Sequence, residues 1–151
     1  MTISIRHAVE ADQVTIVSFI RQAKINPRNL HWQNFLVAEE NGQVVGIRQI
    51  KVHSQGTREV ASGFVLPEYR RQGISERLMN ELLAPETGPV YTMVNEKWAP
   101  YYERFGFRRV DESQLPADFR KDYRIGRIVT SLISIFRKDK LHIIPLKRET
   151  S

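Results

Sequence analysis

The chain has 151 residues, of which 41% are hydrophobic and 26% charged, values that suit one globular domain with one core. It contains no cysteine, which excludes disulfides, thiolate metal sites and a cysteine nucleophile. No stretch reaches the ~18 apolar residues of a membrane span, and residues 1–8 lack the form of a signal peptide, so we expect a cytoplasmic protein.

The net charge of +6 belongs to the C-terminal part of the chain. Residues 120–151 hold nine Lys or Arg against three Asp or Glu, which leaves fourteen of each sign in residues 1–119. Such a basic tail can bind a polyanion, but it lacks the regularly interleaved aromatic residues that stack on bases. We therefore interpret the tail as a solvated surface and do not expect nucleic acid as a partner.

The first half of the chain predicts one strand, one helix and three further strands. Residues 3–6 alternate as a strand does, and Asp12 can cap a helix that residues 26–29 end. The apolar face of that helix consists of Ile16, Phe19, Ile20 and Ala23. The three strands are expected at 35–39, 44–52 and 59–65, joined by the hairpin pair Asn41-Gly42 and a tight turn at 54–56.

The second half predicts alternating helices and strands. Residues 75–83 have helical spacing, with Ile74, Leu78 and Leu82 on one face. A strand at 90–94, a short helix at 98–105 closed by Gly106, and a strand at 107–110 follow. The whole predicts a mixed α/β sheet domain over residues 1–151, with helices on the faces of the sheet.

The basic tail predicts a last helix and a last strand. One helix face is apolar and comprises Ile125, Ile128, Val129, Leu132, Ile133 and Phe136. We expect this face to pack on the domain, with a homodimer contact, a membrane or a partner helix as the alternatives. Residues 141–146 are the expected strand, and Pro145 predicts that it lies at an edge or a bulge.

Residues 64–76 carry the pattern of a phosphate-binding turn. A strand ends before Pro67, and a basic, glycine-containing turn opens the next helix. Backbone N–H groups and the dipole at a helix N-terminus bind phosphate oxygens, Gly73 permits close approach, and Arg70 and Arg71 add charge for a diphosphate. An ordinary strand-to-helix turn on a basic surface explains the composition equally well, because short glycine motifs are weak by themselves.

The order of residues in this segment resembles the signature Q/R-x-x-G-x-G/A of the GNAT superfamily of acetyltransferases. It stands here as Arg70-Arg71-Gln72-Gly73-Ile74-Ser75, with serine in place of the last small residue, after the lead-in Val65-Leu66-Pro67-Glu68-Tyr69. A second segment, Asn95 to Phe107, is similar to the family pattern N-x(6)-Y-x-x-x-G-F, although Trp98 replaces a usual alanine. The resemblance covers roughly residues 3–110 and, with two motifs in the right order, is far more specific than either motif alone.

The resemblance implies a mostly antiparallel central sheet with helices on both faces and strands that splay apart at the cofactor site. It implies acetyl-CoA as the cofactor and no metal. The pantetheine arm would pair with the backbone of Phe64 and Val65, with Asn95 in contact with the arm. The diphosphate would lie on the turn, whose residues are Arg70, Arg71, Gln72, Gly73, Ile74, Ser75 and Glu76.

The resemblance also supplies candidates for acid–base chemistry. Tyr102 matches the position of a tyrosine that protonates the leaving sulfur, against the alternatives of a core aromatic residue or of Tyr101 in that role. Glu59 lies at the offset where some members carry a glutamate base, against the alternative of a surface carboxylate paired with Arg58 or Lys51.

These residues predict an N-acetyltransferase that moves acetyl from acetyl-CoA directly to a primary amine, since no cysteine can hold the acyl group. The acceptor is a small amine, an amino acid, a peptide N-terminus or a protein lysine. A non-catalytic acyl-CoA-binding or sensing module is the alternative. His31 and Trp32 are candidates for the acceptor pocket, and His53 receives no role. The four histidines are scattered, so we expect no metal site.

Overall fold

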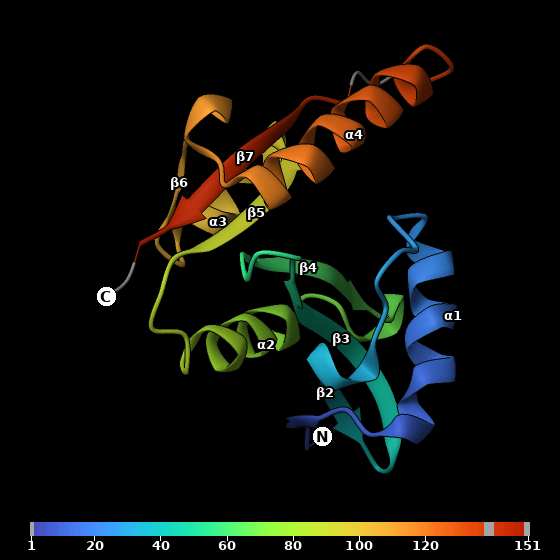
Figure 1. The fold of residues 1–151 in the computed structure, drawn as a ribbon. Coiled ribbons are helices and arrows are strands. Elements are labelled where there is room, and N and C mark those ends of the chain that lie inside the picture. Colours follow the sequence, from blue (N-terminus) through green and yellow to red (C-terminus); the bar gives the residue numbers. More distant parts are fainter. Residues whose placement is uncertain (1, 138–140, 150–151) are drawn as a thin grey trace. The chain divides into compact units, whose positions relative to one another are not determined.

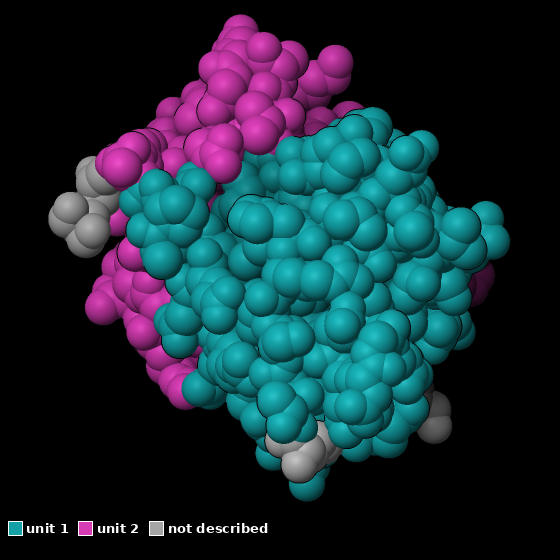
Figure 2. All heavy atoms as spheres, turned by 90° about the horizontal axis from the view of Figure 1, so that it is seen from below, with its two compact units in different colours: residues 1–51, 60–86 teal, residues 52–59, 87–151 magenta. Residues whose placement is uncertain are grey.

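The computed structural model describes residues 2–137 and 141–149, which divide into two compact units (Figures 1 and 2). Unit 1 comprises residues 1–51 and 60–86, and unit 2 comprises residues 52–59 and 87–151. The strands are hydrogen-bonded in the order β1-β2-β3-β4-β5-β7-β6, a mixed and mostly antiparallel arrangement. Strands β3 and β4 contribute to both units, and the turn between them belongs to unit 2.

Unit 1 confirms the elements predicted for the first half of the chain and the first helix predicted for the second half. They are β1 (Ser4–His7), α1 (Gln13–Ala23), β2 (Phe35–Glu40), β3 (Gln43–Val52), β4 (Arg58–Val65) and α2 (Ile74–Leu83). Strand β2 pairs antiparallel with both β1 and β3. Asn41 and Gly42 have φ angles of 50° and 79°, the left-handed conformation that a two-residue hairpin turn between right-twisted strands requires.

Helices cover both faces of the strands in unit 1, because side chains alternate along each strand. The core cluster between α1 and the strands consists of Ala8, Ile16, Phe19, Ile20, Phe35, Val37 and Ile47. On the other face, Gly46 of β3 approaches α2 so closely that a Cβ there would lie 3.2 Å from Ile74 and 3.4 Å from Leu78. The glycine therefore allows α2 to sit against the sheet.

Asp12 precedes α1 as predicted, but its carboxylate does not cap that helix. It accepts the Val9 N–H at 2.8 Å and forms an ion pair with Arg6, also at 2.8 Å. Asp12 thus occupies the predicted N-cap position of α1 without a side-chain capping hydrogen bond, because a short 3-10 turn, Glu10–Asp12, comes before the helix. The carboxylate closes that turn instead.

Unit 2 contains β5 (Val90–Asn95), α3 (Ala99–Glu103), β6 (Phe107–Arg109), α4 (Ala117–Ser134) and β7 (Ile143–Arg148). Strand β7 pairs antiparallel with β5 and β6, while Arg58 and Glu59 of β4 pair parallel with β5. The short helix predicted at 98–105 is split into a 3-10 turn, Glu96–Trp98, and α3. Gly106 closes it with a φ of 91°, as predicted.

Pro145 does not lie in an edge strand, because β7 runs between β5 and β6. Its carbonyl accepts the Val110 N–H at 3.3 Å, one residue beyond the end of β6. In an antiparallel ladder, the backbone N–H and C=O of one residue point toward the same neighbouring strand. The N–H that proline lacks would therefore face a place where β6 has already ended, so an inner strand tolerates the residue.

The apolar face of α4 does not pack on the domain, contrary to the expectation. Phe119 and Tyr123 are the buried residues of this helix, whereas Ile128, Leu132 and Phe136 are 62%, 59% and 89% exposed. The helix contacts its own unit through a different side, where Gly126 lies against Met93 of β5. The spacing identified the helix correctly but not the side that packs.

Candidate functional site

Residues 70–76 comprise the end of the connection between β4 and α2 and the first turn of α2, and we call this segment the basic turn. Arg71 and Gly73 have φ angles of 64° and 77°, both left-handed. Helix α2 then begins at Ile74, and its first helical hydrogen bond runs from the Arg77 N–H to the Gly73 carbonyl at 3.0 Å. The N–H groups of a first helical turn have no acceptor within the helix, and tight turns with left-handed residues aim successive N–H groups at anions.

Glycine is required at position 73 by the backbone and not by crowding. A Cβ added at Gly73 would meet no atom of the chain within 4 Å, so the space beside it is open. A left-handed φ costs an ordinary residue roughly 1–2 kcal/mol. The position thus combines a conformation suited to glycine with room for a ligand to approach the backbone, which fits the diphosphate that the sequence predicts.

Arg70 lies back against the end of β4. Its Nε donates to the Val65 carbonyl at 2.9 Å, and its guanidinium carbon lies 5.5 Å from the centre of the Phe64 ring. Phe64 in turn packs on Phe19 of α1, with ring centres 5.0 Å apart. The residues predicted to meet the pantetheine arm, Phe64 and Val65, are therefore tied to the basic turn through this arginine.

The other predicted site residues, Glu59, Asn95 and Tyr102, all lie in unit 2. Asn95 ends β5, and its Oδ1 accepts the Lys97 N–H at 3.3 Å, so the side chain caps the 3-10 turn that follows. Tyr102 on α3 is half-buried and packs edge-to-face on Phe107, with ring centres 5.8 Å apart. Tyr101 is half-buried as well, so exposure does not distinguish the two tyrosines.

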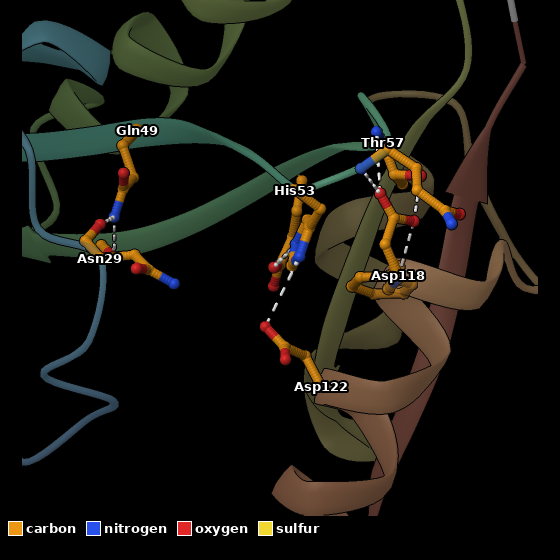
Figure 3. A network of polar contacts seen from close by, with 10 residues as sticks. Asn29, Gln49, His53, Thr57, Asp118 and Asp122 are labelled. Carbon is orange, nitrogen blue, oxygen red and sulfur yellow. Dashed lines mark hydrogen bonds and ion pairs between the residues drawn. The ribbon is translucent and has the colours of Figure 1, made fainter.

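Glu59 is buried and has a partner that the sequence interpretation overlooked. Its Oε1 lies 2.8 Å from Nε2 of His53, whose Nδ1 lies 3.5 Å from Oδ2 of Asp122 on α4 (Figure 3). We call these three residues the His53 cluster. The hydrogen bond with the Glu59 carboxylate raises the pKa of His53 above its ordinary 6.5, burial opposes this, and the charges of Glu59, Asp122 and Asp118 add to the rise.

Asp118 holds the turn that carries His53. Its carboxylate accepts the Thr57 Oγ1–H at 2.5 Å and the backbone N–H groups of Gln55 and Thr57 at 2.8 and 3.3 Å (Figure 3). Burial would raise the pKa of Asp118, but these hydrogen bonds and one from the Phe119 N–H outweigh it and lower the pKa. Helix α4 therefore fixes the β3–β4 turn by charge-assisted hydrogen bonds.

One signal in the sequence could have found His53. The histidine and Glu59 flank the tight turn predicted at 54–56, and residues on either side of a hairpin turn are cross-strand neighbours. Asp118 and Asp122 gave no such signal, because they are far away along the chain and reach the turn only through the packing of α4.

The residues predicted for the acceptor pocket lie in unit 1, on the segment between α1 and β2. Trp32 packs against the core cluster of α1, and its backbone N–H donates to Gln13 Oε1 at 2.9 Å. His31 is exposed. Gln49 ties the same segment to the strands, since its Nε2 donates to the Asn29 carbonyl at 3.3 Å and to Ser62 Oγ at 2.7 Å (Figure 3).

Two further features concern the part of the chain that the structure describes. No group of three or more His, Asp or Glu residues there could hold a metal ion. Within the same residues, no helix combines the length and the apolar character that crossing a membrane demands.

Comparison with known proteins gives a consistent result. A family described as "Acetyltransferase (GNAT) domain" matches residues 31–109. An uncharacterized N-acetyltransferase of Chlorobaculum tepidum is 28% identical over 94 residues, which are 61% of each chain. The chain thus spans less than two thirds of the length of this relative.

Solved structures share the fold at low sequence identity. N-acetylglutamate synthase from Neisseria gonorrhoeae, complexed with coenzyme A and N-acetyl-glutamate, matches with a TM-score of 0.76 and 21% identity, over 100% of this chain and 36% of its own. The protein Rv2747 from Mycobacterium tuberculosis, in complex with CoA, matches with a TM-score of 0.74 and 21% identity, over 98% of this chain and 99% of its own.

Proposed function

Because the chain belongs to the GNAT family of acetyltransferases, we propose that it is an N-acetyltransferase that moves acetyl from acetyl-CoA directly to a primary amine. The basic turn carries this proposal, since left-handed Arg71 and Gly73 precede the N-terminus of α2 and the space beside Gly73 is open. The two structural neighbours with coenzyme A bound support the same ligand. Location in the cytoplasm stays a prediction from composition.

In this proposal, residues of unit 1 bind the donor substrate. The backbone of the basic turn holds the diphosphate, with Arg71 supplying positive charge at its edge. The end of β4 at Phe64 and Val65 holds the pantetheine arm, and a backbone N–H there stabilises the oxyanion that forms on the thioester oxygen. Asn95 stays the predicted side-chain contact of the same arm.

Two residues of unit 2 handle the protons. An ammonium has no lone pair, so the acceptor must first lose a proton, and we assign Glu59 to take it. Tyr102 donates its hydroxyl proton to the leaving sulfur, so the C–S bond breaks as an S–H bond forms. No acyl-enzyme on cysteine is involved, since the sequence has no cysteine.

For the acceptor we favour an amine of amino-acid size, held near His31 and Trp32. The Neisseria neighbour binds N-acetyl-glutamate, an acetylated amino acid, which supports this choice. Peptide N-termini and protein lysines are the competing acceptors.

The test is an assay of thiol release from acetyl-CoA with a panel of amino acids, small amines and peptides. We expect turnover with at least one class of acceptor. Tyr102→Phe should lower kcat on the order of 100-fold with unchanged CoA affinity, because general acid catalysis contributes about 10²–10⁴-fold. Tyr101→Phe is the matched control and should retain most of the activity.

Two outcomes would contradict the assignment at different levels. Tight acetyl-CoA binding without thiol release on the whole panel would instead indicate an acyl-CoA-binding or sensing module. A large loss in Tyr101→Phe with an active Tyr102→Phe would keep the activity and move the acid to the other tyrosine.

A further inference from the structure

Unit 2 contains a buried histidine between two carboxylates that come from different elements. His53 directly follows β3, Glu59 belongs to β4, and Asp122 belongs to α4. The side chains of His53 and Glu59 are each 7% exposed, whereas that of Asp122 is 25% exposed. The cluster is thus closed to water at Glu59 and reaches water at Asp122.

We propose that His53 and Asp122 are positioning residues for Glu59, and that the charge of His53 decides whether Glu59 can act as a base. This inference rests on the proposed function, since it presumes that Glu59 takes a proton from the acceptor. It adds a residue that the family resemblance does not supply.

The geometry of the hydrogen bond fixes the carboxylate. Nε2 of His53 lies 2.8 Å from Oε1 of Glu59, and an imidazole with its proton on Nε2 donates to this oxygen and orients the carboxylate. A neutral imidazole that keeps its proton on Nε2 makes this hydrogen bond as well as a charged one does. The orientation of Glu59 therefore does not depend on the charge of His53.

Proton transfer from the acceptor to Glu59 does depend on that charge. A protonated imidazole stabilises the ionised carboxylate beside it, which makes Glu59 a weak acceptor for a substrate proton. When the Nδ1–H bond breaks, the proton passes toward Asp122 and water, and the imidazole stays neutral with Nε2–H on Glu59. The imidazolium charge then no longer opposes proton transfer, and the carboxylate can form an O–H bond with the proton of the acceptor ammonium as the N–H bond breaks.

The charged groups that raise the pKa of His53 are three carboxylates, which favour its protonated form. Glu59 faces Nε2, Asp122 faces Nδ1, and Asp118 contributes its charge from one turn earlier on α4. The ring of Phe119 also packs edge-to-face on the imidazole, with centres 5.6 Å apart. The pKa of His53 is raised accordingly, so its titration falls on the alkaline side of an ordinary histidine.

The first arm of the test does not need activity. The ring protons of His53 are followed by NMR across pH in the wild type, in Glu59→Gln and in Asp122→Asn. We expect a midpoint above the ordinary 6.5 in the wild type and lower midpoints in both variants. A wild-type midpoint at or below 6.5 would overturn the inference.

The second arm compares kcat/KM against pH for the wild type and His53→Gln with one acceptor, whose own titration is common to both profiles. The glutamine amide can donate to Glu59 as Nε2 does, but it does not titrate. We expect the acidic limb to move to lower pH in His53→Gln, with rates at high pH within about threefold of the wild type. Asp122→Asn should shift the limb in the same direction, and His53→Ala should lower kcat at every pH.

The control is His142→Gln, which changes an exposed histidine of unit 2 that lies 3.7 Å from Glu96. It should leave the profile unchanged. Coincident profiles for wild type and His53→Gln would overturn the positioning role while the acetyltransferase activity stands. Absence of turnover in the wild type at any pH would instead count against the proposed function itself.

Discussion

The basic turn and the His53 cluster are two polar regions of one protein, built in opposite ways. The basic turn is a run of consecutive, mostly exposed residues whose backbone conformation, at Arg71 and Gly73, is its main feature. The His53 cluster joins side chains from β4, the β3–β4 turn and α4, and two of its three members are buried. The first region is therefore sensitive to φ angles, and the second to the loss of a partner.

The largest expected effect tests the backbone character of the basic turn. Gly73→Val should weaken CoA binding by roughly 10- to 100-fold, because a β-branched residue with left-handed φ costs about 1–3 kcal/mol and its methyl groups fill the open space. Isothermal titration calorimetry with CoA measures the change. Gly73→Asn is the control, since asparagine tolerates this conformation, and it should lose clearly less affinity. Equal losses of CoA affinity in the two variants would mean that the left-handed φ of residue 73 does not determine binding.

The next effect tests the side-chain character of the region around His53. Asp118→Ala should lower the free energy of unfolding by roughly 2–3 kcal/mol, because it removes a charged acceptor from Thr57 and two further backbone donors. Urea unfolding measures the loss. CoA affinity should change less than twofold, since the basic turn keeps its backbone. A stable variant that no longer binds CoA would erase the distinction between the two regions.

The same distinction explains what could be predicted from the sequence. The basic turn, the Asn41-Gly42 hairpin and the Gly106 cap were predictable because neighbouring residues determine each of them. The partner of Glu59, the roles of Asp118 and Asp122, and the position of Pro145 in an inner strand depend on contacts between distant segments. The apolar face of α4 belongs to this second group, because spacing reveals a face and packing decides which side is covered.

A smaller effect separates the two neighbouring arginines of the basic turn. Arg71→Gly should raise the free energy of unfolding by about 0.5–1 kcal/mol, because it relieves a left-handed φ of 64° in a residue with a side chain. Arg70→Gly should lower it by a similar amount, since Arg70 has a φ of −72° and its Nε donates to the Val65 carbonyl. Thermal unfolding of both variants measures whether each substitution raises or lowers the free energy of unfolding.

The effect of the charge of these arginines on CoA binding is measured separately from the effect of their backbone conformation on stability. Both variants should bind CoA less tightly, by less than tenfold each, and more so at low salt, because each removes one exposed positive charge. A loss of stability in Arg71→Gly as large as that in Arg70→Gly would show that the conformation of Arg71 carries no strain.

The smallest effect concerns the pH dependence of stability in the His53 cluster. Because the hydrogen bond with Glu59 raises the pKa of His53 in the folded state, the folded protein binds this proton more tightly than the unfolded chain. The stabilisation is therefore fully present below pH 6.5 and is lost as the pH rises through the raised pKa. The free energy of unfolding of the wild type, minus that of His53→Gln, should thus fall with rising pH, by at most about 1 kcal/mol, the range of a single ion pair that reaches water. In a Glu59→Gln background the same difference should depend less on pH. A difference that grows with rising pH would mean that the folded protein holds His53 neutral, and the cluster would then be a hydrogen-bonded part of the core with no charge to release.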